Sequence, residues 1–137
     1  MASLTIRRPV ALQVIVTEEF KKELTEELQE AADAAERRME QIDYQARHLL
    51  AELQRQNLNQ AMAARQQIEA EKRKQEAVRK ELLQQIEEVG KLELGSEFPR
   101  GTLEGTVEIK DGDNLFAKLG QTAIVVKDGV VVEIREA

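Results

Sequence analysis

Residues 10–28 read VALQVIVTEEFKKELTEEL, and the spacing of their apolar residues changes at Thr17. Before Thr17 every second residue is apolar, which is the period of a half-buried strand. After it the apolar residues Phe20, Leu24 and Leu28 recur at steps of four, which is the period of a helix. Thr17 is a natural N-cap, and the glutamates that follow it lie where the helix dipole favours negative charge. We therefore predict a strand that ends at Thr17 and a helix that begins directly after it.

The helical pattern continues over residues 18–89. All seven glycines lie at Gly90 or later and the two prolines are Pro9 and Pro99, so backbone chemistry breaks no helix in this range. The apolar residues form a narrow seam with steps of three and four, which is typical of a coiled coil. The pattern weakens over residues 54–60 and then resumes.

Two arrangements fit this helical pattern. The chain can bend near Asn57 into a hairpin, the arrangement we favour. Alternatively, the helix runs straight and pairs antiparallel with a second chain, so that each N-terminal strand joins the other chain's β domain. In the hairpin Met39 lies beside Gln75 and Ile42 beside Lys72, which requires the lysine ammonium to reach water. The local pairing is the same in both arrangements, and both stay open here.

Residues 90–137 read as β structure, and Gly90 is the expected helix C-cap. Asp128-Gly129 is the preferred two-residue type I′ turn, and valine-rich segments flank it on both sides. A hairpin is therefore predicted around this turn. The pairs expected in its register are Val125 with Val132 and Val126 with Val131.

A strand or a hairpin alone buries little core, so we expect the two ends of the chain to form one domain. The predicted fold class is α+β, with a long antiparallel coiled coil and a small antiparallel β sheet or barrel. Residues 1–17 supply the N-terminal strand, residues 18–89 the coiled coil, and residues 90–137 the remaining strands.

Three segments resemble the YlqD family, whose members are small bacterial and cyanobacterial proteins without an assigned activity. The segments are Leu94-Gly95-Ser96-Glu97, Asp111-Gly112-Asp113 and residues 124–135, which read IVVKDGVVVEIR. The upstream order of a strand and then a coiled coil is also similar to that family. The resemblance implies no catalytic or binding residues.

The residues themselves favour no catalytic, cofactor or metal site. The chain has no cysteine, and His48 is its single histidine. Residues 111–114 superficially match a calcium loop, but Phe116 and Thr122 stand where an EF-hand needs glycine and glutamate. No serine or threonine has a base nearby in the pattern. We therefore expect a protein that is not an enzyme and has no small-molecule substrate.

The expected function is protein–protein interaction or scaffolding through the coiled coil, with self-association as a dimer and an unidentified protein partner. Leu58 and Met62, near the break, are candidate partner contacts or, equally, the bend's own packing. No apolar run reaches the roughly 20 residues of a membrane helix. The cysteine-free composition fits a reducing cytoplasm, so we expect a cytoplasmic protein without a membrane anchor.

The alternative is an RNA- or ribosome-associated module that uses the β domain. A net charge of −6 and the absence of interleaved aromatic residues argue against nucleic acid. The candidate phosphate contacts for this alternative are Arg7, Arg8, Lys72, Arg73 and Lys74.

Overall fold

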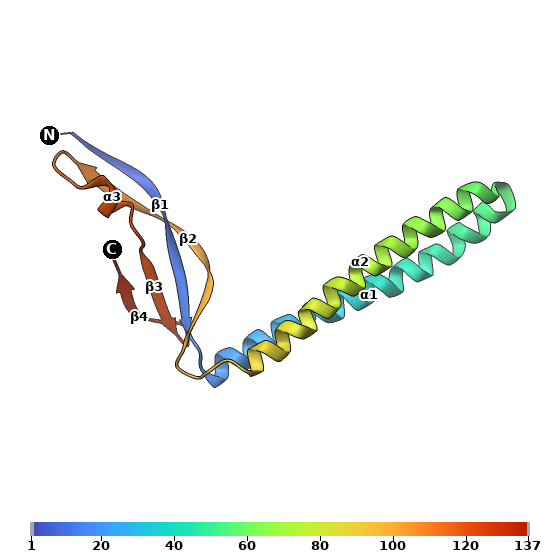
Figure 1. Ribbon diagram of the computed structural model, residues 1–137, viewed down its shortest axis with the longest axis horizontal. Coiled ribbons are helices and arrows are strands. Elements are labelled where there is room, and N and C mark those ends of the chain that lie inside the picture. The colour runs from blue at the N-terminus through green and yellow to red at the C-terminus, as the bar shows by residue number, and fades with distance from the viewer. Residues whose placement is uncertain (1, 137) are drawn as a thin grey trace. The chain divides into compact units, whose positions relative to one another are not determined.

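The computed structural model describes residues 2–136 and has the α+β architecture predicted from the sequence. These residues divide into two compact units, which we call the helical unit (residues 22–91) and the β unit (residues 2–21 and 92–136). The elements, in chain order, are β1 (Ser3–Ile15), α1 (Glu18–Gln56), α2 (Leu58–Gly90), β2 (Glu97–Lys110), α3 (Leu115–Lys118), β3 (Ala123–Lys127) and β4 (Val130–Arg135) (Figure 1).

The helical unit is a hairpin in which α1 and α2 lie side by side (Figure 1). Its turn contains neither glycine nor proline, and Asn57 alone breaks the helix, with an extended backbone at φ −156°. The Asn57 side-chain oxygen accepts hydrogen bonds from the backbone N–H groups of Asn59 and Gln60, at 3.0 and 3.2 Å. This N-cap satisfies the free donors at the start of α2. The chain thus has the hairpin connectivity rather than the straight helix.

Small residues line the contact between the two helices. Alanine contributes most of the buried positions of the helical unit, which are Leu24, Ala32, Ala35, Ala46, Ala61 and Val89. Because alanine has a short side chain, the helix backbones can approach closely. Lys72 forms an ion pair with Asp43 at 2.7 Å, one residue from the predicted neighbour Ile42, and its ammonium remains partly exposed.

The β unit contains one four-stranded sheet in the order β2-β1-β3-β4. The sheet is mixed and open, which corrects the predicted antiparallel sheet or barrel. β1 runs antiparallel to β2 but parallel to β3, with Ala11 opposite Ala123 and Val14 opposite Val126. β2 already occupies one edge of β1, and the long connection through α3 returns the chain to the other edge in the direction of β1.

The turn between β3 and β4 has the predicted geometry, with positive φ angles at Asp128 (48°) and Gly129 (84°). The register of this hairpin is correct for Val126, which pairs with Val131. It is wrong for Val125, which pairs with Glu133 because a bulge leaves Val132 as an extra residue.

The start of α1 follows the sequence prediction. The Thr17 hydroxyl accepts a hydrogen bond from the Phe20 backbone N–H at 3.1 Å and donates one to the Asp128 carboxylate at 2.7 Å. The predicted end of α2 is wrong by one residue, since Gly90 is helical and Lys91 caps the helix. The Phe20 ring also contacts Phe98 at a centroid distance of 5.5 Å. Both contacts lie within the β unit, which includes the first residues of α1.

Candidate interaction surfaces

The tip of the helical hairpin presents apolar side chains to solvent. Leu58 and Met62 are 64% and 59% exposed, whereas Ala61 in the same turn of α2 is 3% exposed. Ala61 therefore fills the seam, and the two larger residues point away from it. The Asn57 cap holds the bend, while Leu58 and Met62 keep more than half of their surface exposed.

Exposed apolar residues of the helical unit gather toward this tip. Within residues 22–91, all of which the structure describes, the large exposed apolar side chains are Tyr44, Leu49, Leu58, Met62 and Val78. All of them except Val78 lie between positions 44 and 62. The rings of Tyr44 and His48 make an edge-on contact with a centroid distance of 5.6 Å, so His48 packs against an aromatic side chain on the surface of α1.

The two candidate phosphate contacts of β1 already have partners within the β unit. Arg7 lies 3.5 Å from a Glu104 carboxylate oxygen. The Arg8 side chain is only 14% exposed; it donates a hydrogen bond to the Lys118 backbone carbonyl at 2.7 Å and lies 3.6 Å from Glu136. Arg8 thus tethers the α3 segment to β1, which is a structural role.

The other candidate phosphate contacts lie on α2 in the helical unit; they are Lys72, Arg73 and Lys74. The hydrogen bond to Asp43 raises the pKa of Lys72 above its usual value of 10.5, and the charges of Asp43 and Glu69 add to the effect against desolvation. Arg73 and Lys74 are exposed. The structure therefore leaves these two bases presented to solvent, while Lys72 is part of the helix pairing.

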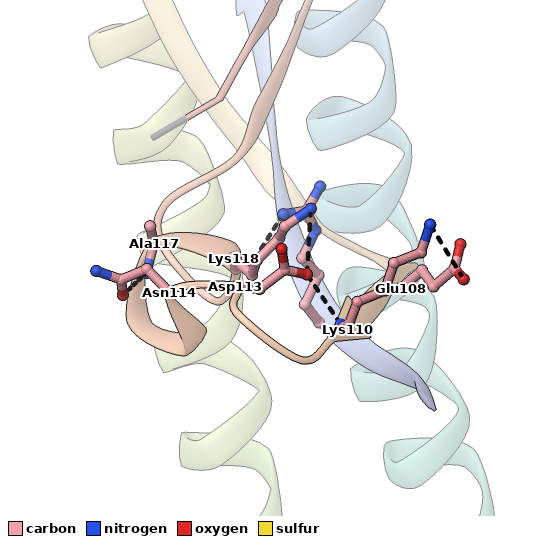
Figure 2. Close-up of polar contacts among 7 residues, drawn as sticks. Glu108, Lys110, Asp113, Asn114, Ala117 and Lys118 are labelled. Atoms are coloured by element: carbon pink, nitrogen blue, oxygen red, sulfur yellow. Dashed lines mark hydrogen bonds and ion pairs between the residues drawn. The ribbon is translucent and has the colours of Figure 1, made fainter. Parts of the chain in front are cut away.

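The acidic segment at residues 111–114 forms a turn (Figure 2). The Asp113 carboxylate accepts a hydrogen bond from the Lys110 backbone N–H at 2.9 Å and lies 4.0 Å from the Lys118 ammonium. Asn114 caps α3 by accepting from the Ala117 backbone N–H at 3.1 Å. These oxygens are engaged in closing the turn. Among residues 2–136 no group of three or more histidine, cysteine or acidic side chains could hold a metal ion.

One face of the sheet carries a shallow depression of about 530 Å³. A cross-strand row forms its floor, with Thr102, Ala11, Ala123 and Arg135 each opposite the next. The depression exists because Ala11 and Ala123 have short side chains and leave space that larger side chains would fill. Arg135 is the one ionisable side chain in the lining, and two carboxylates already hold it.

A side-chain ion pair that no sequence pattern indicated connects the two edge strands. Arg135 of β4 donates to both carboxylate oxygens of Glu97 on β2, at 2.6 and 2.8 Å, and to Glu133 at 3.0 Å. The hydrogen bond from Arg135 lowers the pKa of Glu97, assisted by the arginine charge and opposed by desolvation. The same contacts raise the pKa of Arg135, so the guanidinium stays charged.

The two units define a class of protein in which a long helical hairpin is inserted between the strands of a small open mixed sheet. The chain belongs to the YlqD family, which it matches over residues 4–135. It is 34% identical to the uncharacterised protein YlqD of Bacillus subtilis (strain 168) over 127 residues, which cover 93% of this chain and 94% of that protein.

A crystal structure of a protein of unknown function from Synechococcus sp. WH 8102 has the same fold, with a TM-score of 0.84. The two chains are 32% identical, and the match covers 98% of this chain and 96% of the other. Neither relative carries a named activity. Among the described residues, no helix has the length and apolar content that crossing a membrane requires.

Proposed function

We propose that this protein is a non-enzymatic interaction module, in which the helical hairpin pairs as a coiled coil and presents its tip to a protein partner. The supporting observation is the exposure of Leu58 and Met62 beside a turn that is capped by Asn57. Exposed apolar side chains that cluster in this way are typical of protein-binding sites. The seam between α1 and α2 makes a rigid helix pair that holds the tip in place. In this proposal the protein acts as a self-associating scaffold in the cytoplasm.

The chemistry of a suitable partner follows from the tip. Leucine and methionine offer an apolar contact, and the unbranched methionine side chain adapts to the surface it meets. Tyr44 and Leu49 extend the apolar character along the distal part of α1. A partner with an apolar groove or helix face would bury these side chains and gain about 25 cal/mol for each square ångström of apolar surface removed from water.

The test is a capture experiment with the full chain and the double variant Leu58→Gln/Met62→Gln, which keeps good helix formers on α2. Protein partners captured from the native cell extract should remain after nuclease treatment and be lost with the variant. The matched control is Leu4→Gln/Leu94→Gln, which removes two exposed apolar residues of the β unit and should leave capture unchanged.

Two results would contradict the proposal. Equal capture by the wild type and the tip variant would remove the tip from recognition. Capture of ribosomal or RNA-binding proteins that disappears on nuclease treatment would favour the nucleic-acid alternative instead. Circular dichroism of each variant establishes that the helices are intact.

A further inference from the structure

β4 is an edge strand with unusually little protection. It is the last strand of the sheet order and pairs only with β3 among the described strands. All six of its residues are exposed, including Val130, Val131, Val132 and Ile134. The strand contains no lysine, proline or glycine, the residues that commonly blunt an edge. Its outer row of backbone N–H and C=O groups is therefore available for another strand.

The bulge in β4 limits where a regular ladder can form. It lies near the turn, where Val132 is the extra residue, while Glu133, Ile134 and Arg135 pair regularly with β3. Because a bulge disrupts the local ladder, a strand added from outside fits best on the regular segment. The centre of that segment is Ile134.

The regular segment is complementary to itself. In an antiparallel pair of two β4 strands centred on Ile134, this residue lies opposite its own copy. Glu133 then lies opposite Arg135 of the second copy, and the two-fold axis repeats that pair. A register centred one residue earlier would instead place the two Glu133 carboxylates opposite each other, which is destabilising.

We propose that a second copy of this chain docks on β4, through an antiparallel β4–β4 pair centred on Ile134. The pairing continues the four-stranded sheet across the two-fold axis. It places two Glu133–Arg135 ion pairs on one face of the sheet and an apolar Ile134–Ile134 contact on the other. Arg135 can take part while holding Glu97 and Glu133 of its own chain, since a guanidinium has five donors and these contacts use three of them. The contact covers few residues and belongs to the small interface class, below about 1,200 Å², so the dimer is weak. This inference deepens the self-association in the proposed function and identifies the surface responsible.

Cysteine cross-linking tests the register directly, because the natural chain contains no cysteine. Residues directly opposite each other across antiparallel strands have Cβ atoms about 4.5–5.5 Å apart, close to disulfide geometry. Under mild oxidation, Ile134→Cys should therefore form a disulfide-linked dimer. The matched control is Leu4→Cys, since Leu4 and Ile134 are both 66% exposed; it should form no disulfide-linked dimer because Leu4 lies outside the β4–β4 pair. Cross-linking of Ile134→Cys no greater than that of Leu4→Cys, or weaker than that of Val132→Cys, would overturn the proposal.

Sedimentation equilibrium without cysteines is the second measurement. Glu133→Lys places a lysine opposite Arg135 of the second copy twice, so the dissociation constant of the dimer should rise by about tenfold. An unchanged constant, or a wild-type chain that stays monomeric at high concentration, would refute the pairing. Introducing Leu58→Gln/Met62→Gln into Ile134→Cys should leave cross-linking intact, which separates a failure of the tip proposal from a failure of this one.

Discussion

Arg135 and Glu97 form a bidentate ion pair although they lie on β4 and β2, the opposite edge strands of the open sheet. The strand register places both residues on the face that contains Ile15, Gln13 and Val125. Val125 is buried on this face, with 1% exposure. Side-chain hydrogen bonds thus connect two edges that no backbone ladder joins.

Replacing Arg135 by glutamine should loosen β4. The variant loses the charge-assisted ion pair with Glu97, and with it a side chain that spans the sheet face on which Val125 lies. The amide hydrogens of β4 should therefore exchange faster, and the melting temperature should fall by a few degrees. Hydrogen exchange read by mass spectrometry or NMR measures the effect. The control is Arg7→Gln, which removes an exposed pair at 3.5 Å and should change little. Equal protection of β4 in both variants would contradict this role for Arg135.

The same pair predicts the response of the β unit to acid. The Glu97 pKa is lowered below 4.5, so the stabilisation is present above that pH and is lost as the pH falls through the folded-state pKa. The difference in melting temperature between wild type and Glu97→Gln should therefore shrink between about pH 5 and about pH 2. A difference that stays constant over this range would show that Glu97 does not titrate with unfolding.

Local chemistry explains which parts of the fold the sequence predicted. The Thr17 cap and the positive φ angles of Asp128-Gly129 depend on residues next to each other in the chain. The break at Asn57 has only a weak local signal, a polar segment that contains two asparagines. These features follow from rules that apply within a few residues.

The features that the sequence did not reveal depend on distant segments. The bulge at Val132 arises from the pairing of β4 with β3, and nothing in the valine run marks it. β1 begins at Ser3, before the alternating pattern that starts at Val10. The reason is that the pairing with β2 includes Arg7, Arg8 and Pro9, which lack a strand period. Pro9 is accommodated because β3 pairs only with Ala11 to Val14. The Arg135–Glu97 pair likewise requires the assembled sheet.

Two glycines should respond to alanine in opposite directions. Gly129 has a φ of +84°, so Gly129→Ala strains the turn and should lower the unfolding free energy by about 1 kcal/mol. Gly90 is helical with nothing within 4 Å of an added Cβ, so Gly90→Ala should raise it by about 0.5–1 kcal/mol. Urea titration followed by circular dichroism compares the two variants. Shifts of the same sign would contradict the assigned backbone conformations.

Gln75 places a polar group in the seam of the helical hairpin, and replacing it by leucine should stabilise the hairpin. The side-chain oxygen of Gln75 is buried without a hydrogen-bond partner, while its amide nitrogen donates to Glu71 at 3.2 Å. An unpaired buried oxygen costs about 1–3 kcal/mol, so Gln75→Leu should raise the unfolding free energy of the hairpin by about 1–2 kcal/mol. Urea unfolding monitored by helical circular dichroism measures this gain.

The matched control for Gln75→Leu is Gln85→Leu, because Gln85 lies exposed on the same helix. A surface substitution of this kind should stay within about 0.5 kcal/mol of wild type. If both variants shift stability equally, Gln75 is not desolvated in the seam. Polar seam residues also fix how helices pair, and the alternative straight-helix dimer has the same local contacts as the hairpin. A Gln75→Leu chain that is more stable and no more dimeric than wild type would show that Gln75 is not needed for the hairpin connectivity.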